Sequence, residues 1–189
     1  MAQFTKQAIM QTFMLLIDEK PFDKITVTDI VERCGINRNT FYYHYPDLYA
    51  LVDDLFRSEA KKIIDAQKDY AAWMGGFLAA VEFTLDNKRA ILNIYNSVSR
   101  DRLEKYLYDV AKSTITQFVR EQAEGLDAAE EDIETLSMFY SVALAGLAAK
   151  WLQSGMKNDI VEIFGRLNVL LDGDIRASLA KRKRSPKKP

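Results

Sequence analysis

The fold is decided by residues 26–45, which read TVTDIVERCGINRNTFYYHY. Thr26 is a favourable N-cap residue, and Asp29, three positions later, completes the pattern of a capping box. The apolar residues that follow recur at positions i, i+3, i+4 and i+7 of one helix face: Val27, Ile30, Val31 and Cys34. Gly35 supplies the left-handed residue that ends many helices. The pattern therefore predicts a helix over 27–34 with one buried face.

A second short helix is predicted over 38–44. Asn37 is its N-cap, and Phe41 and Tyr45, four residues apart, are expected to face the core. Two short helices joined by so tight a turn form a helix-turn-helix. Its outward face carries side chains that suit DNA: Arg38, Asn39, Thr40, Tyr42, Tyr43 and His44. Arginine and asparagine can bind the edges of guanine and adenine, and the hydroxyls and imidazole can donate to phosphate oxygens. From this spacing alone, a helical hairpin that does not bind DNA is the alternative.

The rest of the chain predicts an all-α protein of about nine helices. No proline lies between residues 47 and 185, and apolar residues recur there at spacings of three and four. Gly125, Gly155 and Gly173 lie where C-cap glycines belong. The expected helices cover about residues 5–19, 27–34, 38–44, 48–68, 70–85, 87–96, 101–124, 128–154 and 159–171.

Composition excludes several classes of protein. The 189 residues are 48% apolar and 28% charged, which is typical of a globular chain. Cys34 is the single cysteine and His44 the single histidine, so an internal disulfide is excluded and most metal sites are removed. We therefore expect no metal and no cofactor. A helical enzyme is the rival interpretation, but the sequence has no catalytic nucleophile motif and no phosphate-binding loop to support it. We therefore expect that the protein is not an enzyme.

Charge is distributed unevenly along the chain. Seven of the 26 basic side chains lie in residues 176–189, which leaves 19 against 27 acidic ones and a net charge of −8 elsewhere. Residues 1–50 carry a net charge of −1, which opposes strong non-specific binding to nucleic acid. The tail is expected to be disordered, with nucleic-acid binding as the alternative. The longest apolar run, residues 142–149, is far shorter than the roughly 20 residues of a membrane span, so we expect no membrane contact. The single cysteine favours a reducing compartment, so we expect a cytoplasmic protein.

Residues 25–45 resemble the DNA-binding signature of the TetR family of bacterial regulators, and the similarity extends over roughly residues 5–60. The resemblance implies a homodimer that binds a palindromic operator in double-stranded DNA and acts as a repressor released by a small-molecule inducer. It implies DNA contacts for Thr26, Arg38, Asn39, Thr40, Tyr42, Tyr43 and His44. Leu48 stands where the family usually has a lysine near the phosphate backbone. A helix-turn-helix protein that acts through protein–protein interaction, with weak or lost DNA binding, is the alternative.

The resemblance also implies a division of labour along the chain. Residues 1–63 would form the DNA-binding headpiece, a long fourth helix would join it to a ligand-binding and dimerisation domain over 64–175, and the basic tail would follow over 176–189. The segment 87–89 with Tyr95, and the segment 151–155, are similar to a C-terminal subtype found in regulators of dihydroxyacetone kinase operons.

Two sets of residues in the C-terminal part are functional candidates. Aromatic side chains that could line a ligand pocket, or simply form core, are Trp73, Phe77, Tyr95, Tyr106, Phe118 and Phe139. The helix over 128–154 is rich in small residues, which let a second helix approach closely. Candidates for a dimer interface are Ala145, Gly146, Ala149 and Leu152. The alternative is that this helix lies in the core of a monomer.

Overall fold

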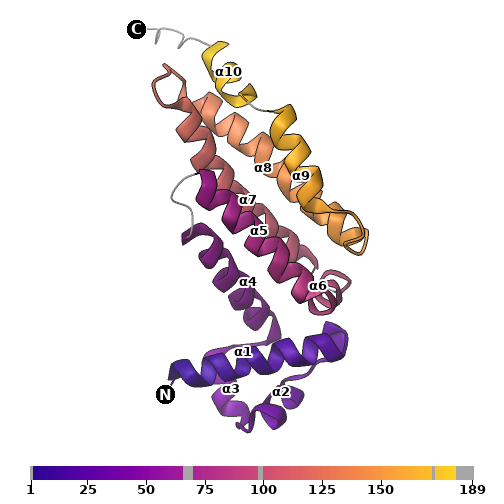
Figure 1. The fold of residues 1–189 in the computed structure, drawn as a ribbon. Helices are drawn as coiled ribbons and strands as arrows, with labels where there is room; N and C mark the ends of the chain where they lie inside the picture. The colour runs from indigo at the N-terminus through magenta and orange to yellow at the C-terminus, as the bar shows by residue number, and fades with distance from the viewer. Residues whose placement is uncertain (1, 66–69, 98–99, 172, 182–189) are drawn as a thin grey trace. The chain divides into compact units, whose positions relative to one another are not determined.

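The computed structural model describes the backbone of residues 2–65, 70–97, 100–171 and 173–181, and their side chains apart from 2, 3, 60 and 62–76. In these ranges it contains ten α-helices, one short 3-10 helix over Phe22–Lys24 and no strand (Figure 1). The α-helices are α1 (Ala2–Glu19), α2 (Val27–Cys34), α3 (Arg38–His44), α4 (Leu48–Asp65), α5 (Tyr70–Asp86), α6 (Lys88–Tyr95), α7 (Arg100–Ala123), α8 (Glu130–Gln153), α9 (Ile160–Leu170) and α10 (Asp174–Lys181). The all-α prediction is confirmed.

The chain divides into two compact units. Unit 1 comprises Met1–Lys62 and Glu82–Tyr106, and unit 2 comprises Ile63–Val81 and Leu107–Pro189. Helices α4, α5 and α7 each contribute residues to both units. The N-terminal unit is therefore larger than a three-helix headpiece, because it also contains α6 and the first turns of α7.

Unit 1 has a core of aliphatic and aromatic side chains. Ile9, Phe13 and Ile17, on one face of α1, are fully buried, as are Ile30 of α2 and Phe41 of α3. Burying a side chain of this size stabilises the fold by about 1.5–3 kcal/mol. Helix α1 contacts both α2 and α6, so it is the central element of this unit.

Unit 2 is organised around buried residues of three helices. The cluster consists of Ile115, Val119, Ile133, Ile175 and Leu179. The last two lie one helical turn apart on α10, where their burial offsets the cost of ordering the chain. Residues 176–181 are therefore helical, which corrects the prediction of a disordered tail for that part. The remaining tail residues lie outside the described part of the chain.

Helix α10 also caps the end of α7. The guanidinium of Arg176 donates to the backbone carbonyls of Gln122 and Glu124, at 2.8 and 3.1 Å. The last carbonyls of a helix have no partner inside the helix, and a cation placed there satisfies them. This contact gives α10 a polar anchor beside its two buried apolar side chains.

Of the glycines predicted to end helices, Gly35 is the C-cap of α2, Gly125 and Gly155 follow the ends of α7 and α8, and Gly173 instead directly precedes α10. Gly35 ends α2 with φ 69° and ψ 30°, and its N–H bonds the carbonyls of Val31 and Glu32. The other predicted caps, Gly125, Gly155 and Gly173, also have positive φ values. Gly35 sets the direction of the chain between α2 and α3, so the helix-turn-helix depends on a conformation that residues with a Cβ rarely adopt.

We predict that Gly35→Ala lowers the free energy of unfolding by about 1–2 kcal/mol, because alanine is strained in the left-handed region. No atom lies within 4 Å of the position its Cβ would take, so the cost comes from the backbone alone. Chemical denaturation followed by circular dichroism measures it. Gly35→Asn is the control and should cost less, since asparagine tolerates this conformation better. Equal costs for both variants would contradict this account.

Candidate nucleic-acid interface

The start of α2 is fixed by the predicted capping box. The Thr26 hydroxyl accepts from the Asp29 N–H at 3.2 Å, and the Asp29 carboxylate accepts from the Thr26 N–H at 2.7 Å. The Thr26 hydroxyl also donates to that carboxylate, and the Lys20 ammonium lies 2.9 Å from it. These bonds, led by the one from the Thr26 hydroxyl, lower the pKa of Asp29 to about 2. The carboxylate is thus ionised at neutral pH, and both capping bonds are maintained.

Helix α3 begins at a second side-chain cap. The side-chain amide oxygen of Asn37 accepts from the Thr40 N–H at 2.8 Å and from the Thr40 hydroxyl at 3.0 Å. Helix α3 is only 7 residues long, so its orientation depends on contacts rather than on intrinsic helix stability. Phe41 supplies the main contact, because its ring is fully buried in the core of unit 1.

The opposite face of α3 is open to solvent. Arg38 and Asn39 are exposed, Tyr42 is 51% exposed and Tyr43 is 79% exposed. His44 is half-buried, with its ring edge-to-face against that of Tyr43 at 5.0 Å. Neighbouring exposed aromatic side chains rimmed by polar residues can mark a binding surface. Of the α3 residues that the sequence singled out, four are thus exposed, and Thr40 and His44 are half-buried.

The residue after α3 ties this helix to its neighbours. The buried Tyr45 hydroxyl donates to Asp54 of α4 at 2.8 Å, and burial together with that carboxylate raises the pKa of Tyr45. Lys6 of α1 forms an ion pair with the same carboxylate at 3.0 Å. Three helices therefore meet at Asp54, which restricts the angle at which α3 can lie.

Residues distant in sequence also support unit 1. The Asn93 amide of α6 donates to the backbone carbonyl of Ile17, near the end of α1, at 2.7 Å. Arg102 of α7 forms an ion pair with Asp53 of α4, and its guanidinium lies 4.8 Å from the centre of the Tyr49 ring. Sequence reasoning missed these contacts, because no local pattern links residues 76 and 49 positions apart.

Most cations near the helix-turn-helix are already paired. Lys6 and Lys20 pair with Asp54 and Asp29, and Arg33 pairs with Glu19 at 2.6 Å. The Arg33 guanidinium lowers the pKa of Glu19, and the carboxylate in turn raises that of Arg33. Among the described residues, the remaining basic side chains of residues 1–50 form no ion pair: Lys24 and Arg38. Few positive charges are therefore available for phosphate without breaking an existing pair.

The aromatic pocket candidates fall in different units. Tyr95 is buried in unit 1, and Tyr106 of the same unit stacks on Phe56 with ring centres 4.9 Å apart. In unit 2, Phe77 stacks on Phe164, Phe118 packs against the core cluster, and Phe139 is 63% exposed. The Trp73 side chain lies outside the described residues.

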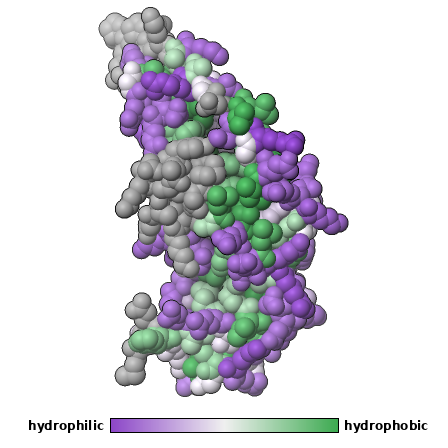
Figure 2. Space-filling model, in the orientation of Figure 1, coloured by the Kyte–Doolittle hydropathy of each residue, from purple (hydrophilic) through white to green (hydrophobic). Residues whose placement is uncertain are grey.

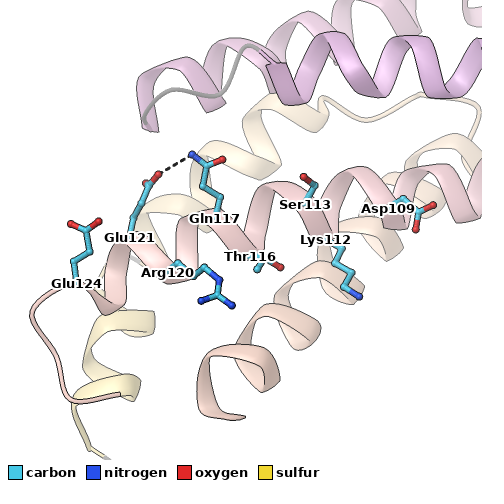
Figure 3. Close-up of a pocket in the computed structure, with 8 residues that line it drawn as sticks. All are labelled: Asp109, Lys112, Ser113, Thr116, Gln117, Arg120, Glu121 and Glu124. Atoms are coloured by element: carbon cyan, nitrogen blue, oxygen red, sulfur yellow. Dashed lines mark hydrogen bonds between the residues drawn. The ribbon is translucent and has the colours of Figure 1, made fainter. Parts of the chain in front are cut away.

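An open groove of about 590 Å³ runs along α7 instead (Figure 3). Its described lining comes from α7 and from the residue that follows it: Asp109, Lys112, Ser113, Thr116, Gln117, Arg120, Glu121 and Glu124. The lining is polar and carries both signs of charge, and Gln117 donates to Glu121 at 3.1 Å. Among the side chains that the structure describes, none of the predicted aromatic residues lines this groove.

A capped helix-turn-helix with an exposed polar recognition helix defines the class of protein: a DNA-binding regulator. Residues 9–55 match the family described as "Bacterial regulatory proteins, tetR family", and residues 71–173 match "Transcriptional regulator C-terminal region". The chain belongs to the tetR family of bacterial regulatory proteins. Proteins of this family are transcription regulators, not enzymes.

The chain is also similar to one curated protein and to one solved structure. The chain is 25% identical over 84 residues to the HTH-type dhaKLM operon transcriptional activator DhaS of Lactococcus lactis subsp. lactis (strain IL1403), a match of 44% of this chain. That alignment spans 45% of the length of the relative, which is less than half. The solved structure of a dihydroxyacetone kinase operon activator DhaS has the same fold, with a TM-score of 0.74 and 18% identity over 92% of this chain and 97% of the other.

Leu48 occupies the position at which the family usually has a lysine. Leu48 is the half-buried first residue of α4, and Asp47 before it caps the helix by accepting from the Ala50 N–H at 2.7 Å. We expect Leu48→Lys to steepen the slope of log K against log salt by about 0.9 for each headpiece on DNA, because each adds one phosphate contact. Binding titrations at several salt concentrations measure the slope.

The gain in affinity should be equal on operator and on random DNA, because phosphate contacts carry no sequence information. Leu48→Gln is the control, since it adds a polar side chain of similar length without the charge. An unchanged slope in a folded Leu48→Lys protein would mean that residue 48 does not lie near a phosphate.

Proposed function

We propose that this protein regulates transcription by binding a specific operator through the exposed face of α3, and that two copies of the chain bind together. The observation that carries the proposal is the solvent-exposed polar face of α3, on a helix that begins at the Asn37 side-chain cap and is held by the buried ring of Phe41. A rigid support matters because base-specific hydrogen bonds tolerate little error in position. A palindromic operator would follow from the two-fold symmetry of a dimer.

Within α3, the residues fall into two proposed roles. Arg38 and Asn39 lie in the first turn, the end of a recognition helix that approaches base edges, and their side chains suit guanine and adenine. Thr40, Tyr42, Tyr43 and His44, together with Thr26 at the start of α2, would contact phosphates or thymine methyl groups. The Thr26 hydroxyl takes part in the capping box, so only its methyl group and remaining lone pair are available to DNA.

The direction of regulation is a separate question. Repression is what the family resemblance implied, but both relatives described above carry the word activator in their names. A promoter fusion measured with and without the protein decides between the two. A small-molecule effector bound to unit 2 and a cytoplasmic location complete the proposal, on the ground that regulators of this family are commonly controlled by such ligands.

A second candidate function is a helix-turn-helix protein that acts mainly through protein–protein contacts. The paired cations and Leu48 favour it, because they reduce the positive charge available to phosphate. A gel-shift assay against the DNA upstream of the protein's own gene separates the two functions. Specific retardation supports the first, and its absence at low salt supports the second.

Pairing of two chains through α8 and α9 is supported by apolar side chains that unit 2 leaves uncovered. On α8, Met138, Phe139 and Val142 are 56–63% exposed, and on α9 Val169 and Leu170 are about 75% exposed. Figure 2 shows hydrophobic side chains exposed among polar ones in this part of unit 2. Exposed apolar surface of this kind on a regulator is typical of a subunit interface.

The composition of α8 is consistent with such an interface. An 18-residue window of this helix has a mean hydropathy of 1.2, enough for a membrane span by length and composition, and 22% of the window is buried. A single helix of this kind is weak evidence for a membrane, and an interface helix passes the same test. Of the interface candidates, Gly146 is exposed, Ala145 and Ala149 are half-buried, and Leu152 is buried within the unit itself.

We predict that Arg38→Ala costs about 1–3 kcal/mol of binding free energy on the operator and much less on random DNA, because a bidentate contact to a base is lost. Fluorescence anisotropy with both duplexes measures the two losses. Lys24→Ala is the control, since it removes one unpaired cation outside α3 and should weaken both complexes alike. Equal losses for Arg38→Ala on the two DNAs would assign Arg38 to phosphate.

We predict that Gly146→Glu weakens the dimer by about 3 kcal/mol, roughly 100-fold, because it places an unpaired charge in the interface. The single chain should still fold, since no atom lies within 4 Å of the added Cβ. Analytical ultracentrifugation measures the association.

Ala79→Glu, at an exposed position of α5, introduces the same charge and should leave the dimer intact. In the Gly146→Glu variant, operator binding should fall as the dimer dissociates. An undiminished Gly146→Glu dimer would show that the chains pair elsewhere or that α8 meets another partner.

A further inference from the structure

One hydrogen bond joins the two helices of the helix-turn-helix through their polar side chains. The guanidinium of Arg38, the first residue of α3, donates through Nη2 to the Thr28 hydroxyl at 2.6 Å. Thr28 is the second residue of α2 and is half-buried. The bond therefore runs from the first turn of one helix to the first turn of the next, across the turn at Gly35.

The bond to Thr28 restricts the conformations of the Arg38 side chain. A guanidinium has five N–H donors in a planar fork, so one donor placed on Thr28 leaves the others for a ligand. An unrestrained arginine samples many rotamers, and binding must order it at a cost in affinity. Since Arg38 forms no ion pair with any described residue, the Thr28 hydroxyl is the neutral group that restricts it. A neutral acceptor holds the guanidinium without cancelling its charge.

We propose that Thr28 is a positioning residue for base recognition: its hydroxyl holds the Arg38 guanidinium in the orientation that binds a base edge. The proposal rests on the operator binding proposed above and adds the residue that sets how sharply one base pair is discriminated. Thr28 itself need not touch DNA for this role.

The hydroxyl of Thr28 is not needed to form α2. That helix is started by the capping box of Thr26 and Asp29, and it is held to the core by Ile30 and Val31. Replacing Thr28 by valine keeps the branched shape of the side chain and removes only the acceptor. Loss of discrimination in a folded Thr28→Val protein would therefore come from the missing bond to Arg38.

The experiment starts from the operator that the wild-type protein selects from a pool of random duplexes. Binding is then measured on this operator and on a duplex altered at the base pair that Arg38→Ala no longer distinguishes. We expect Thr28→Val to lower the ratio of the two affinities roughly two- to tenfold, the scale set by ordering one long side chain. Thr28→Ser keeps the hydroxyl and should stay within about twofold of wild type.

A double-mutant cycle separates positioning from direct contact. In the Arg38→Ala background, Thr28→Val should change the ratio no further. A further loss there would mean that Thr28 contacts the DNA itself, and it would overturn the proposal. A normal ratio in Thr28→Val, or an equal loss in Thr28→Ser, would overturn it as well.

Two additional results keep the outcome interpretable. If the Thr28→Val protein unfolds at a lower temperature than wild type, Thr28→Ala replaces it, because alanine favours the helix. Thr28→Ala must then lower the ratio of the two affinities as valine was expected to do. If the wild-type protein selects no sequence, the proposed operator binding fails and this inference fails with it. Suppose instead that wild type selects a sequence, that Arg38→Ala lowers the ratio of the two affinities, and that Thr28→Val leaves this ratio unchanged. The proposed operator binding then stands, and only the role of Thr28 is refuted.

Discussion

The burial of Phe41 is the contact on which the recognition surface depends. A helix of 7 residues has little stability of its own, so one face must be held by the core if the other is to be presented to a ligand. Phe41 supplies that hold, and the Tyr45 hydroxyl, bound to Asp54, adds a second one at the end of the helix. The exposed side chains of α3 are thus placed by residues that are themselves buried in unit 1.

The support of this surface extends well beyond the helix-turn-helix. Asn93 and Arg102 connect α6 and α7 to α1 and α4 within the same compact unit, through contacts to Ile17 and Asp53. Any event that displaced α6 would break the bond to the end of α1. The N-terminal unit therefore contains the helix-turn-helix together with segments from later in the chain.

Electrostatics limits how such a protein can bind DNA. The basic side chains around the helix-turn-helix are largely satisfied by carboxylates, and Leu48 removes a charge that the family usually has. In the proposed complex with DNA, affinity would therefore depend more on hydrogen bonds to bases and on the pairing of two chains than on phosphate neutralisation. The exposed aromatic rings of Tyr42 and Tyr43 and the uncovered face of α8 are the features that can supply it.

Local patterns in the sequence determined the helices, the caps and the class of protein. The bounds of α2 and α3, the capping box and the turn at Gly35 were predictable because they depend on residues a few positions apart. Only the tertiary structure decided which polar groups meet: Asn93 with Ile17, and Arg38 with Thr28. It also decided that Ile175 and Leu179 are buried, which makes α10 a helix. The reason is physical: capping and periodicity are short-range, whereas a hydrogen bond or a buried contact between distant segments exists only once the chain has folded.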